Sequence, residues 1–173
     1  MRMKKPLGFV LLLLMLLYVF AVNNGNVFAI DNMEVRDKIL ASDGTSGDNF
    51  GTSVAISEEK MVVGANQDDD NGENSGAVYI YDLSNGNGTF SEVLASEIKL
   101  TASDGAAEDN YGDSVAISGD RVAVGAYRDD DNGTSSGAVY LYDLSAADIP
   151  ASELKITASD AASGDWFGAS VTI

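Results

Sequence analysis

Two acidic loops are the segments of this sequence whose residue types offer the most chemistry. Both contain the letters DDDNG, 61 positions apart, and their polar residues are Asp68, Asp69, Asp70 and Asn71, and Asp129, Asp130, Asp131 and Asn132. Adjacent carboxylates repel one another unless a cation or water relieves them, and calcium prefers hard oxygen ligands of this kind. The alternative is a solvated acidic turn, because Asp, Asn and Gly are the usual turn formers.

The overall composition limits which ligands the protein can bind and which reactions it can catalyse. The 173 residues include 27 Asp and Glu against 10 Lys and Arg, for a net charge of −17, and contain neither Cys nor His. Such a surface repels nucleic acid and attracts cations or basic partners. Without Cys and His there are no disulfides, no His-based zinc sites and no histidine general base. We therefore predict that the protein is not an enzyme.

The first 29 residues have the pattern of a signal peptide. A basic start, with Arg2, Lys4 and Lys5, precedes an apolar stretch of 16 residues from Leu7 to Val22. We predict cleavage after Ala29, export to the medium, the periplasm or the cell surface, and no membrane insertion of the mature chain. The alternative is an uncleaved anchor, although a spanning helix needs about 20 apolar residues.

The rest of the chain is an internal repeat. Residues 40–84 recur as 101–145, and residues 156–173 begin a third copy. Spacings of 61 and then 56 residues are kept by two sets of equivalent positions, which are Asp43, Asp104 and Asp160, and Phe50, Tyr111 and Phe167. A constant spacing of this kind is the mark of a repeat architecture.

Each copy contains four strand signals separated by Gly, Asn and Asp turns. The predicted strands are 51–57, 60–65, 76–83 and 96–103, then 112–118, 121–126, 137–144 and 152–159, with an extra copy of the fourth strand at 36–42. Four short antiparallel strands in a repeat are typical of a β-propeller blade. The sequence therefore predicts an all-β protein with two full blades and the start of a third.

Three aromatic–glycine pairs identify a family resemblance. Phe50-Gly51 with Gly64-Ala65, Tyr111-Gly112 with Gly125-Ala126, and Phe167-Gly168 resemble the FG-GAP repeat. That repeat builds the seven-bladed propeller of integrin alpha subunits and of related bacterial extracellular proteins. The sequence departs from the repeat where Asn66 and Tyr127 replace its proline. We expect Gly51, Gly112 and Gly168 to allow turns or close approach to a neighbouring strand.

The resemblance implies a division of the chain into a signal peptide and blades. The predicted divisions are 1–29 for the signal peptide, 30–95 for the first blade with a leading strand, 96–151 for the second, and 152–173 for the start of the third. Because a propeller closes with roughly four to eight blades, we expect further blades from a longer chain or from other copies, in a ring of roughly seven.

The resemblance also implies calcium in the acidic loops, because family members carry loops of the form Asp-x-Asp-x-Asp-Gly. Two registers are open for the ligands. In one, the ligand positions are Gln67, Asp69 and Asn71 in the first loop, and Arg128, Asp130 and Asn132 in the second. In the other, they include Asp68 and Asp70 in the first loop, and Asp129 and Asp131 in the second. An arginine cannot be a ligand. A second acidic set precedes each aromatic–glycine pair and is predicted to form turns or caps; it comprises Asp43 with Asp48, Asp104 with Asp109, and Asp160 with Asp165.

Four tyrosines lie on one face of the predicted third strands, namely Tyr79, Tyr81, Tyr140 and Tyr142. We predict that they pack between blades, the alternative being a surface stripe that binds sugar or peptide. The function predicted from the resemblance is a secreted or cell-surface scaffold for adhesion or ligand binding, whose partner is an extracellular protein or carbohydrate. The alternatives are an accessory or catalytic part of a secreted hydrolase, and a structural repeat of a large surface protein.

Overall fold

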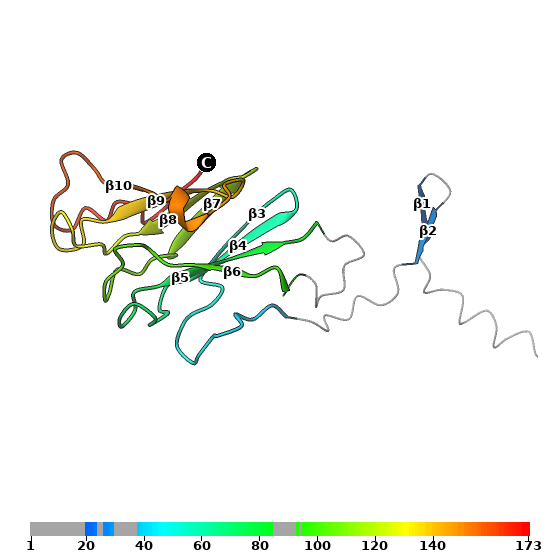
Figure 1. The fold of residues 1–173 in the computed structure, drawn as a ribbon, viewed down its shortest axis with the longest axis horizontal. Coiled ribbons are helices and arrows are strands. Elements are labelled where there is room, and N and C mark those ends of the chain that lie inside the picture. The colour runs from blue at the N-terminus through cyan, green and yellow to red at the C-terminus, as the bar shows by residue number, and fades with distance from the viewer. Residues whose placement is uncertain (1–19, 24–25, 30–37, 85–92, 94) are drawn as a thin grey trace, which may run out of the picture. The chain divides into compact units, whose positions relative to one another are not determined.

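The computed structural model describes residues 20–23, 26–29, 38–84, 93 and 95–173, which belong to two compact units, 1–38 and 39–173. In the first unit, β1 (Phe20–Asn23) and β2 (Asn26–Ala29) pair as an antiparallel hairpin (Figure 1). The rest of the predicted signal peptide lies outside the described residues, so cleavage after Ala29 stays a prediction. Among the residues described, no helix has the length and apolar character needed to cross a membrane.

The second unit contains two four-stranded antiparallel sheets, each with its strands in chain order (Figure 1). The first sheet consists of β3 (Ser53–Ser57), β4 (Lys60–Ala65), β5 (Ala77–Asp82) and β6 (Ile98–Leu100). The second consists of β7 (Ser114–Ser118), β8 (Arg121–Ala126), β9 (Ala138–Asp143) and β10 (Leu154–Ile156), with a 3-10 turn, η1 (Pro150–Ser152), before its last strand. We call these sheets the first and second blades. They confirm the predicted all-β fold class.

All eight blade strands lie within the segments predicted for them. The extra strand predicted at 36–42 is not present in residues 38–42, the part of this segment that the structure describes. Residues 38–42 form no strand, and Ile39 and Ala41 instead pack face-on against the first blade. Residues 36 and 37 lie outside the described part of the chain. Since β6 pairs with β5, the sheets divide the chain after Leu100 and Ile156, whereas the predicted domain divisions fall after residues 95 and 151.

The third strand of the first blade contributes to the core on both of its faces, whereas in the second blade only the face with Tyr140 and Tyr142 is buried. Val78 and Ile80 point to the second blade, where they pack in one cluster with Tyr140 and Tyr142. The opposite face of β5 carries Tyr79 and Tyr81, in a separate cluster with residues 39 and 41. All four predicted tyrosines are buried. The prediction of packing between blades is confirmed for Tyr140 and Tyr142, whereas Tyr79 and Tyr81 pack against the segment before the first blade. These rings form no surface stripe.

The blades meet where the aromatic–glycine pair of the second blade crosses the end of β5. Gly76 and Tyr111 form a parallel bridge, and Ser53 Oγ donates to the carbonyl of Gly112 at 2.7 Å. Gly112 has φ +88°, and a Cβ there would lie 2.6 Å from the carbonyl oxygen of Ala77. This close approach confirms the role predicted for Gly112.

Candidate functional site

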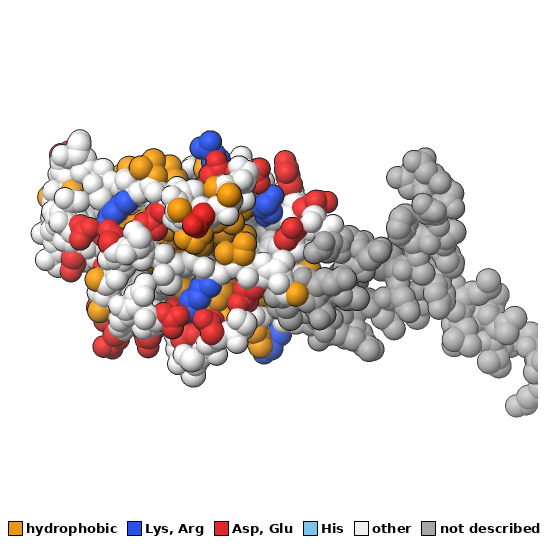
Figure 2. All heavy atoms as spheres, viewed as in Figure 1, with side chains coloured by type: hydrophobic (Ala, Val, Ile, Leu, Met, Phe, Trp, Pro, Cys, Tyr) orange, Lys and Arg blue, Asp and Glu red, His pale blue; other side chains and the backbone are white. Residues whose placement is uncertain are grey.

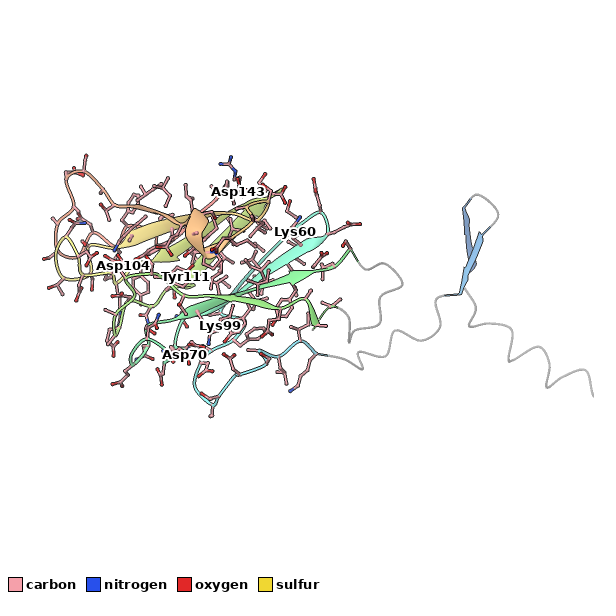
Figure 3. All side chains as sticks on the ribbon, viewed as in Figure 1. Lys60, Asp70, Lys99, Asp104, Tyr111 and Asp143 are labelled. Atoms are coloured by element: carbon pink, nitrogen blue, oxygen red, sulfur yellow. The ribbon has the colours of Figure 1, made fainter. Side chains whose placement is uncertain are left out.

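A lysine lies at the centre of the acidic groups of the first blade. Lys99 of β6 places its Nζ 2.8 Å from Asp43 Oδ2, 2.8 Å from Asp68 Oδ2 and 2.6 Å from Asp70 Oδ2. The ammonium is also 5.3 Å from the ring centre of Tyr79, close enough for a cation–π contact. Figure 3 shows Lys99 and Asp70 beside each other on the first blade.

The second blade repeats this arrangement with its own residues. Lys155 of β10 places its Nζ 2.7 Å from Asp104 Oδ2, 2.7 Å from Asp129 Oδ2 and 2.6 Å from Asp131 Oδ2. Figure 2 shows acidic side chains next to basic ones on the face drawn. We call these two groups the lysine cages, each consisting of one lysine and its three aspartates.

The pairing of strands explains how each lysine reaches its cage. In the antiparallel register of β5 and β6, Lys99 stands opposite Tyr79, so both side chains lie on the same face of the sheet. The Tyr79 hydroxyl is 2.8 Å from Asp43 Oδ1 and 3.0 Å from Asp68 Oδ2. The hydroxyl has one proton, so it donates to one of the two carboxylates at a time. Both carboxylates lie next to the ammonium.

Only some of the predicted metal-site residues converge. In the first loop Asp68 and Asp70 reach the cage, while Asp69 Oδ1 accepts the backbone N–H of Asn74 at 2.8 Å. The equivalent residues behave alike in the second loop, where Asp129 and Asp131 reach Lys155 and Asp130 Oδ1 accepts the Ser135 N–H at 2.6 Å. Neither Asn71 nor Asn132 belongs to the ion pairs of the lysines. The geometry follows the register that contains Asp68 and Asp70.

The second acidic set divides into two roles. Asp48, Asp109 and Asp165 each accept a backbone N–H three residues earlier, as the turn prediction requires. Asp43 and Asp104, in contrast, are ion-pair partners of the lysines. Both aspartates also lie in turns, closed by the bonds from the Gly44 N–H to the Ala41 carbonyl and from the Gly105 N–H to the Ala102 carbonyl. The turn prediction is therefore confirmed, and the ion pair with the lysine of the fourth strand is an additional role of these side chains.

The charges of each cage support one another. Burial lowers the pKa of Lys99, but the three carboxylates outweigh burial and the pKa of Lys99 is raised above its ordinary value. The hydrogen bond from Lys99 holds the pKa of Asp43 below its usual value. The pKa of Lys155 is raised in the same way. Both ammonium groups are therefore protonated at neutral pH.

The cages bear on whether calcium fits these loops. Each ammonium lies where the three carboxylates converge, so a calcium ion at that point requires the lysine to leave. Within the described ranges, no group of three or more Asp or Glu side chains is arranged to hold a metal ion. As arranged, the residues fit an internal ammonium rather than calcium. Calcium at Asp68 to Asn71 and at Asp129 to Asn132 stays a prediction, tested in the Discussion.

Sequence reasoning missed both lysines, although a signal for them exists. The segments predicted as fourth strands read SEIKLTAS and SELKITAS. Lys99 and Lys155 stand at the same repeat position in them, each between two apolar residues. The glutamate of each segment also forms a repeated link. Glu97 accepts hydrogen bonds from Ser42 Oγ at 2.6 Å and from the Tyr81 hydroxyl at 2.7 Å.

The carboxyl group of Asp109 differs from its counterpart in the first blade. Burial raises the pKa of Asp109 to about 6. Its side chain accepts the backbone N–H of Ala106 at 2.7 Å. At the equivalent place Asp48 accepts both the backbone N–H of Thr45, at 2.6 Å, and its hydroxyl, at 2.7 Å. The second blade lacks that hydroxyl because alanine stands at position 106.

We predict that Ala106→Thr lowers the pKa of Asp109 by supplying the missing donor. The folded pKa of Asp109 lies above the unfolded value of 3.8, so the folded state binds more protons in between. Stability therefore falls as the pH rises from about 4 to about 6, by at most about 3 kcal/mol for this group. Urea unfolding across this range measures the fall, which we expect to be smaller in the variant. An unchanged pH profile contradicts the prediction.

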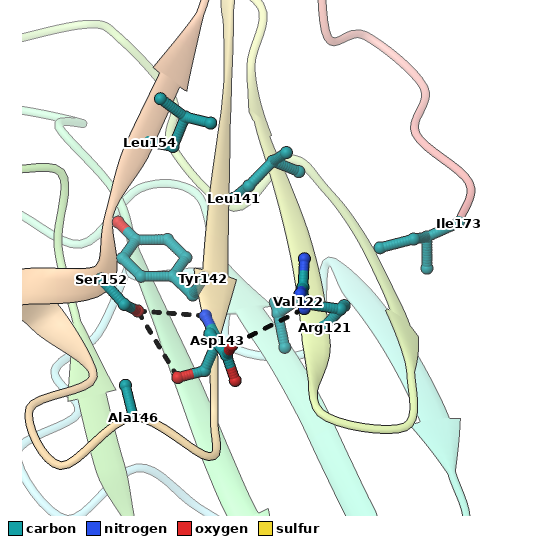
Figure 4. A pocket seen from close by; sticks show the side chains of 9 residues that line it. All are labelled: Arg121, Val122, Leu141, Tyr142, Asp143, Ala146, Ser152, Leu154 and Ile173. Atoms are coloured by element: carbon teal, nitrogen blue, oxygen red, sulfur yellow. Dashed lines mark hydrogen bonds and ion pairs between the residues drawn. The ribbon is translucent and has the colours of Figure 1, made fainter.

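A hollow of about 360 Å³ lies at the outer end of the second blade (Figure 4). Its apolar lining includes Leu141, Leu154 and Ile173, and Asp143 beside it is 3.7 Å from Arg121. At the equivalent place on the first blade, Leu144 and Ile149 of the second blade help to line a hollow of only about 150 Å³. The larger hollow lies on the second blade at the place that, on the first blade, these two residues partly fill.

Stacked four-stranded antiparallel blades, joined by the same aromatic–glycine contact, define a β-propeller-type repeat domain. The family model described as FG-GAP repeat matches residues 34–81, 95–142 and 151–173. The chain belongs to the FG-GAP repeat family, which confirms the resemblance seen in its sequence. Repeats of this family are generally non-catalytic binding or structural units. A comparison with curated proteins found no match.

Proposed function

We propose that this chain is an exported scaffold that binds an extracellular ligand on loops at one end of its blades. The observation that carries the proposal is that these loops form one hydrogen-bonded surface across both blades. We call this surface the loop face, made of residues 43–52, 66–76, 104–113, 127–137 and 160–168. Binding residues concentrate on loops that a rigid framework positions.

Backbone hydrogen bonds connect the loop face within and between the blades. Gln67 donates its N–H to the carbonyl of Asp48 at 3.2 Å, within the first blade. Between blades, the N–H of Glu108 donates to the carbonyl of Glu73 at 2.7 Å. The lysine cages also tie these loops to the fourth strand of each blade. Such a surface loses little conformational entropy on binding, which favours affinity.

Export is supported by the basic and apolar start of the chain. We predict that the mature protein begins at Ile30. Expression of the full chain, followed by N-terminal sequencing of the exported product, checks this prediction. A product that keeps Met1 and stays with the membrane fraction contradicts cleavage and supports the uncleaved anchor.

Ligand binding is tested with the purified mature chain. It is immobilised through its C-terminus and exposed to neutral polysaccharides, acidic polysaccharides and extracellular matrix proteins, with binding followed by interferometry. We expect saturable binding of at least one neutral or basic member, since the mature chain, with 27 acidic and 7 basic residues, has a net charge of −20 and repels acidic ones. The absence of binding to every member contradicts the proposal and favours a structural repeat.

A further inference from the structure

Two residues of the loop face depart from the repeat and meet in space. Tyr127 stands where the first blade has Asn66, and Trp166 stands where earlier copies have Asn49 and Asn110. The rings of Tyr127 and Trp166 lie edge to face, with centres 6.3 Å apart and planes at 90°. The two aromatic residues are 39 positions apart in the sequence. They come together where the start of the third repeat packs against the second blade.

The backbone makes Trp166 an unusual choice at its position. Asn49, Asn110 and Trp166 all have positive φ, at 56°, 55° and 53°. Asparagine tolerates this left-handed conformation, whereas a bulky residue there is an outlier. Strain of this kind is often kept at functional sites.

The two kinds of side chain also contribute differently to the fold. Asn110 is buried, and its Nδ2 donates to the carbonyls of Asn66 at 3.1 Å and Asn74 at 3.3 Å. The side chain of Trp166 is 56% exposed. Packing therefore accounts for Asn110, whereas Asn49 is exposed like Trp166. The exposed indole of Trp166 is accessible to a ligand in this structure.

The aromatic pair lines a hollow of about 530 Å³ together with charged and hydroxyl side chains. Arg128 lies over the Tyr127 ring at 5.4 Å and forms an ion pair with Glu108 at 3.4 Å. Asp130 is held by its bond to the Ser135 N–H, and its second carboxylate oxygen remains an acceptor. The hollow thus combines rigid rings with a few polar groups, as small-ligand sites do.

We propose that this hollow, the Tyr127–Trp166 site, binds a neutral oligosaccharide. The C–H face of a sugar ring stacks on the exposed indole, while its hydroxyls bond Arg128, Glu108 and Asp130. Tyr and Trp supply large, rigid contact area with little loss of side-chain entropy. An acidic sugar is disfavoured by the mature chain, whose 27 acidic and 7 basic residues give a net charge of −20. The proposal rests on the proposed function and names the ligand class of the loop face.

The chain itself supplies the probe for the test, because Trp166 is its only tryptophan. Soluble neutral oligosaccharides of glucose, mannose or galactose are titrated into the mature full chain while tryptophan emission and acrylamide quenching are measured. We expect one series to shift the emission and protect the indole. A response to trimethylammonium compounds, with none to sugars, overturns the proposal in favour of a cation–π cage.

Variants that restore the repeat residues test the site without disturbing the fold. Trp166→Asn and Tyr127→Asn insert the residue found at the equivalent position, and calorimetry with the responsive sugar measures affinity. We expect Trp166→Asn to weaken binding by about 10-fold or more, and Tyr127→Asn by less, since tryptophan is a frequent hot-spot residue. Ile56→Thr is the control, because Ile56 is a 61% exposed apolar residue that does not line the site. It is expected to leave affinity unchanged.

The outcomes separate this inference from the proposed function. Sugar binding that Trp166→Asn leaves intact overturns the Tyr127–Trp166 site while the scaffold function stands. Binding of a protein ligand with no sugar response has the same meaning. A failure of the mature chain to bind any member of the polymer panel and any oligosaccharide overturns both.

Discussion

Lys155→Met is expected to lower the free energy of unfolding by about 3 kcal/mol, because it leaves carboxylates unpaired. Asp129, one of the three aspartates around Lys155, has a side chain only 3% exposed, and Lys155 is its ion-pair partner. Methionine keeps the length and apolar character of the lysine stem, so the change removes mainly the charge. Urea unfolding near neutral pH measures the effect, and Lys99→Met is expected to act alike in the first blade.

The matched control is Lys60→Met. Lys60 pairs with Asp120 at 2.9 Å, but their side chains are 31% and 50% exposed. An exposed pair contributes about 1 kcal/mol or less, so the control should lose little. Equal losses in Lys60→Met and Lys155→Met contradict the view that the lysine cages are special.

The pH dependence of the cage follows from the direction of its pKa shifts. The raised pKa of Lys155 means that its contribution to stability is complete below its unfolded value of 10.5 and is lost only as the pH rises through the folded value. Asp104 has a lowered pKa, because its bonds to Lys155 and Tyr140 outweigh burial. Its contribution is present above 3.8 and is lost on acidification.

Calcium gives the same variants a second readout. With the ammonium in place we expect millimolar calcium to leave the melting temperature of the parent unchanged. The variant with both Lys99→Met and Lys155→Met exposes uncompensated carboxylates, and calcium should restore part of its lost stability. A rise in the parent's melting temperature would support the calcium sites predicted in the acidic loops and contradict the lysine as the resident cation.

Gly112→Ala is expected to be the second large effect. The added Cβ would collide with the carbonyl of Ala77 in the neighbouring blade. Gly51 is the ideal control, since it occupies the same repeat position with φ +93° and has no described atom within 4 Å of an added Cβ. Gly51→Ala carries only the backbone strain, about 1–2 kcal/mol.

We expect Gly112→Ala to lose about 2 kcal/mol more than Gly51→Ala, the usual cost of overpacking. Urea unfolding of both variants beside the parent measures this difference, which isolates the contact between blades from the strain of a positive φ. Equal losses contradict the role assigned to close stacking.

The strands and their faces were predictable because they depend on neighbours in the sequence. The alternation of Val78, Ile80 and the tyrosines in β5 places each side chain on its face whatever lies beyond. Fourth strands were predicted too long: β6 keeps only Ile98 to Leu100, which pair with the middle of β5 although β5 itself continues to Asp82. The segment 38–42 resembled a strand by composition. Its Ile39 and Ala41 instead pack on the face of the first blade that carries Tyr79 and Tyr81, and the segment pairs with no strand.

The repeat, the blade strands, the family and the acidic character of the loops follow from residue types and short-range spacing. The contact of Lys99 with Asp43, 56 positions away, and that of Trp166 with Tyr127 became evident from the folded structure. Both meetings require the strand register and blade stacking together. Spacing along the chain does not encode such convergence, because it arises when separate strands are brought together in one core.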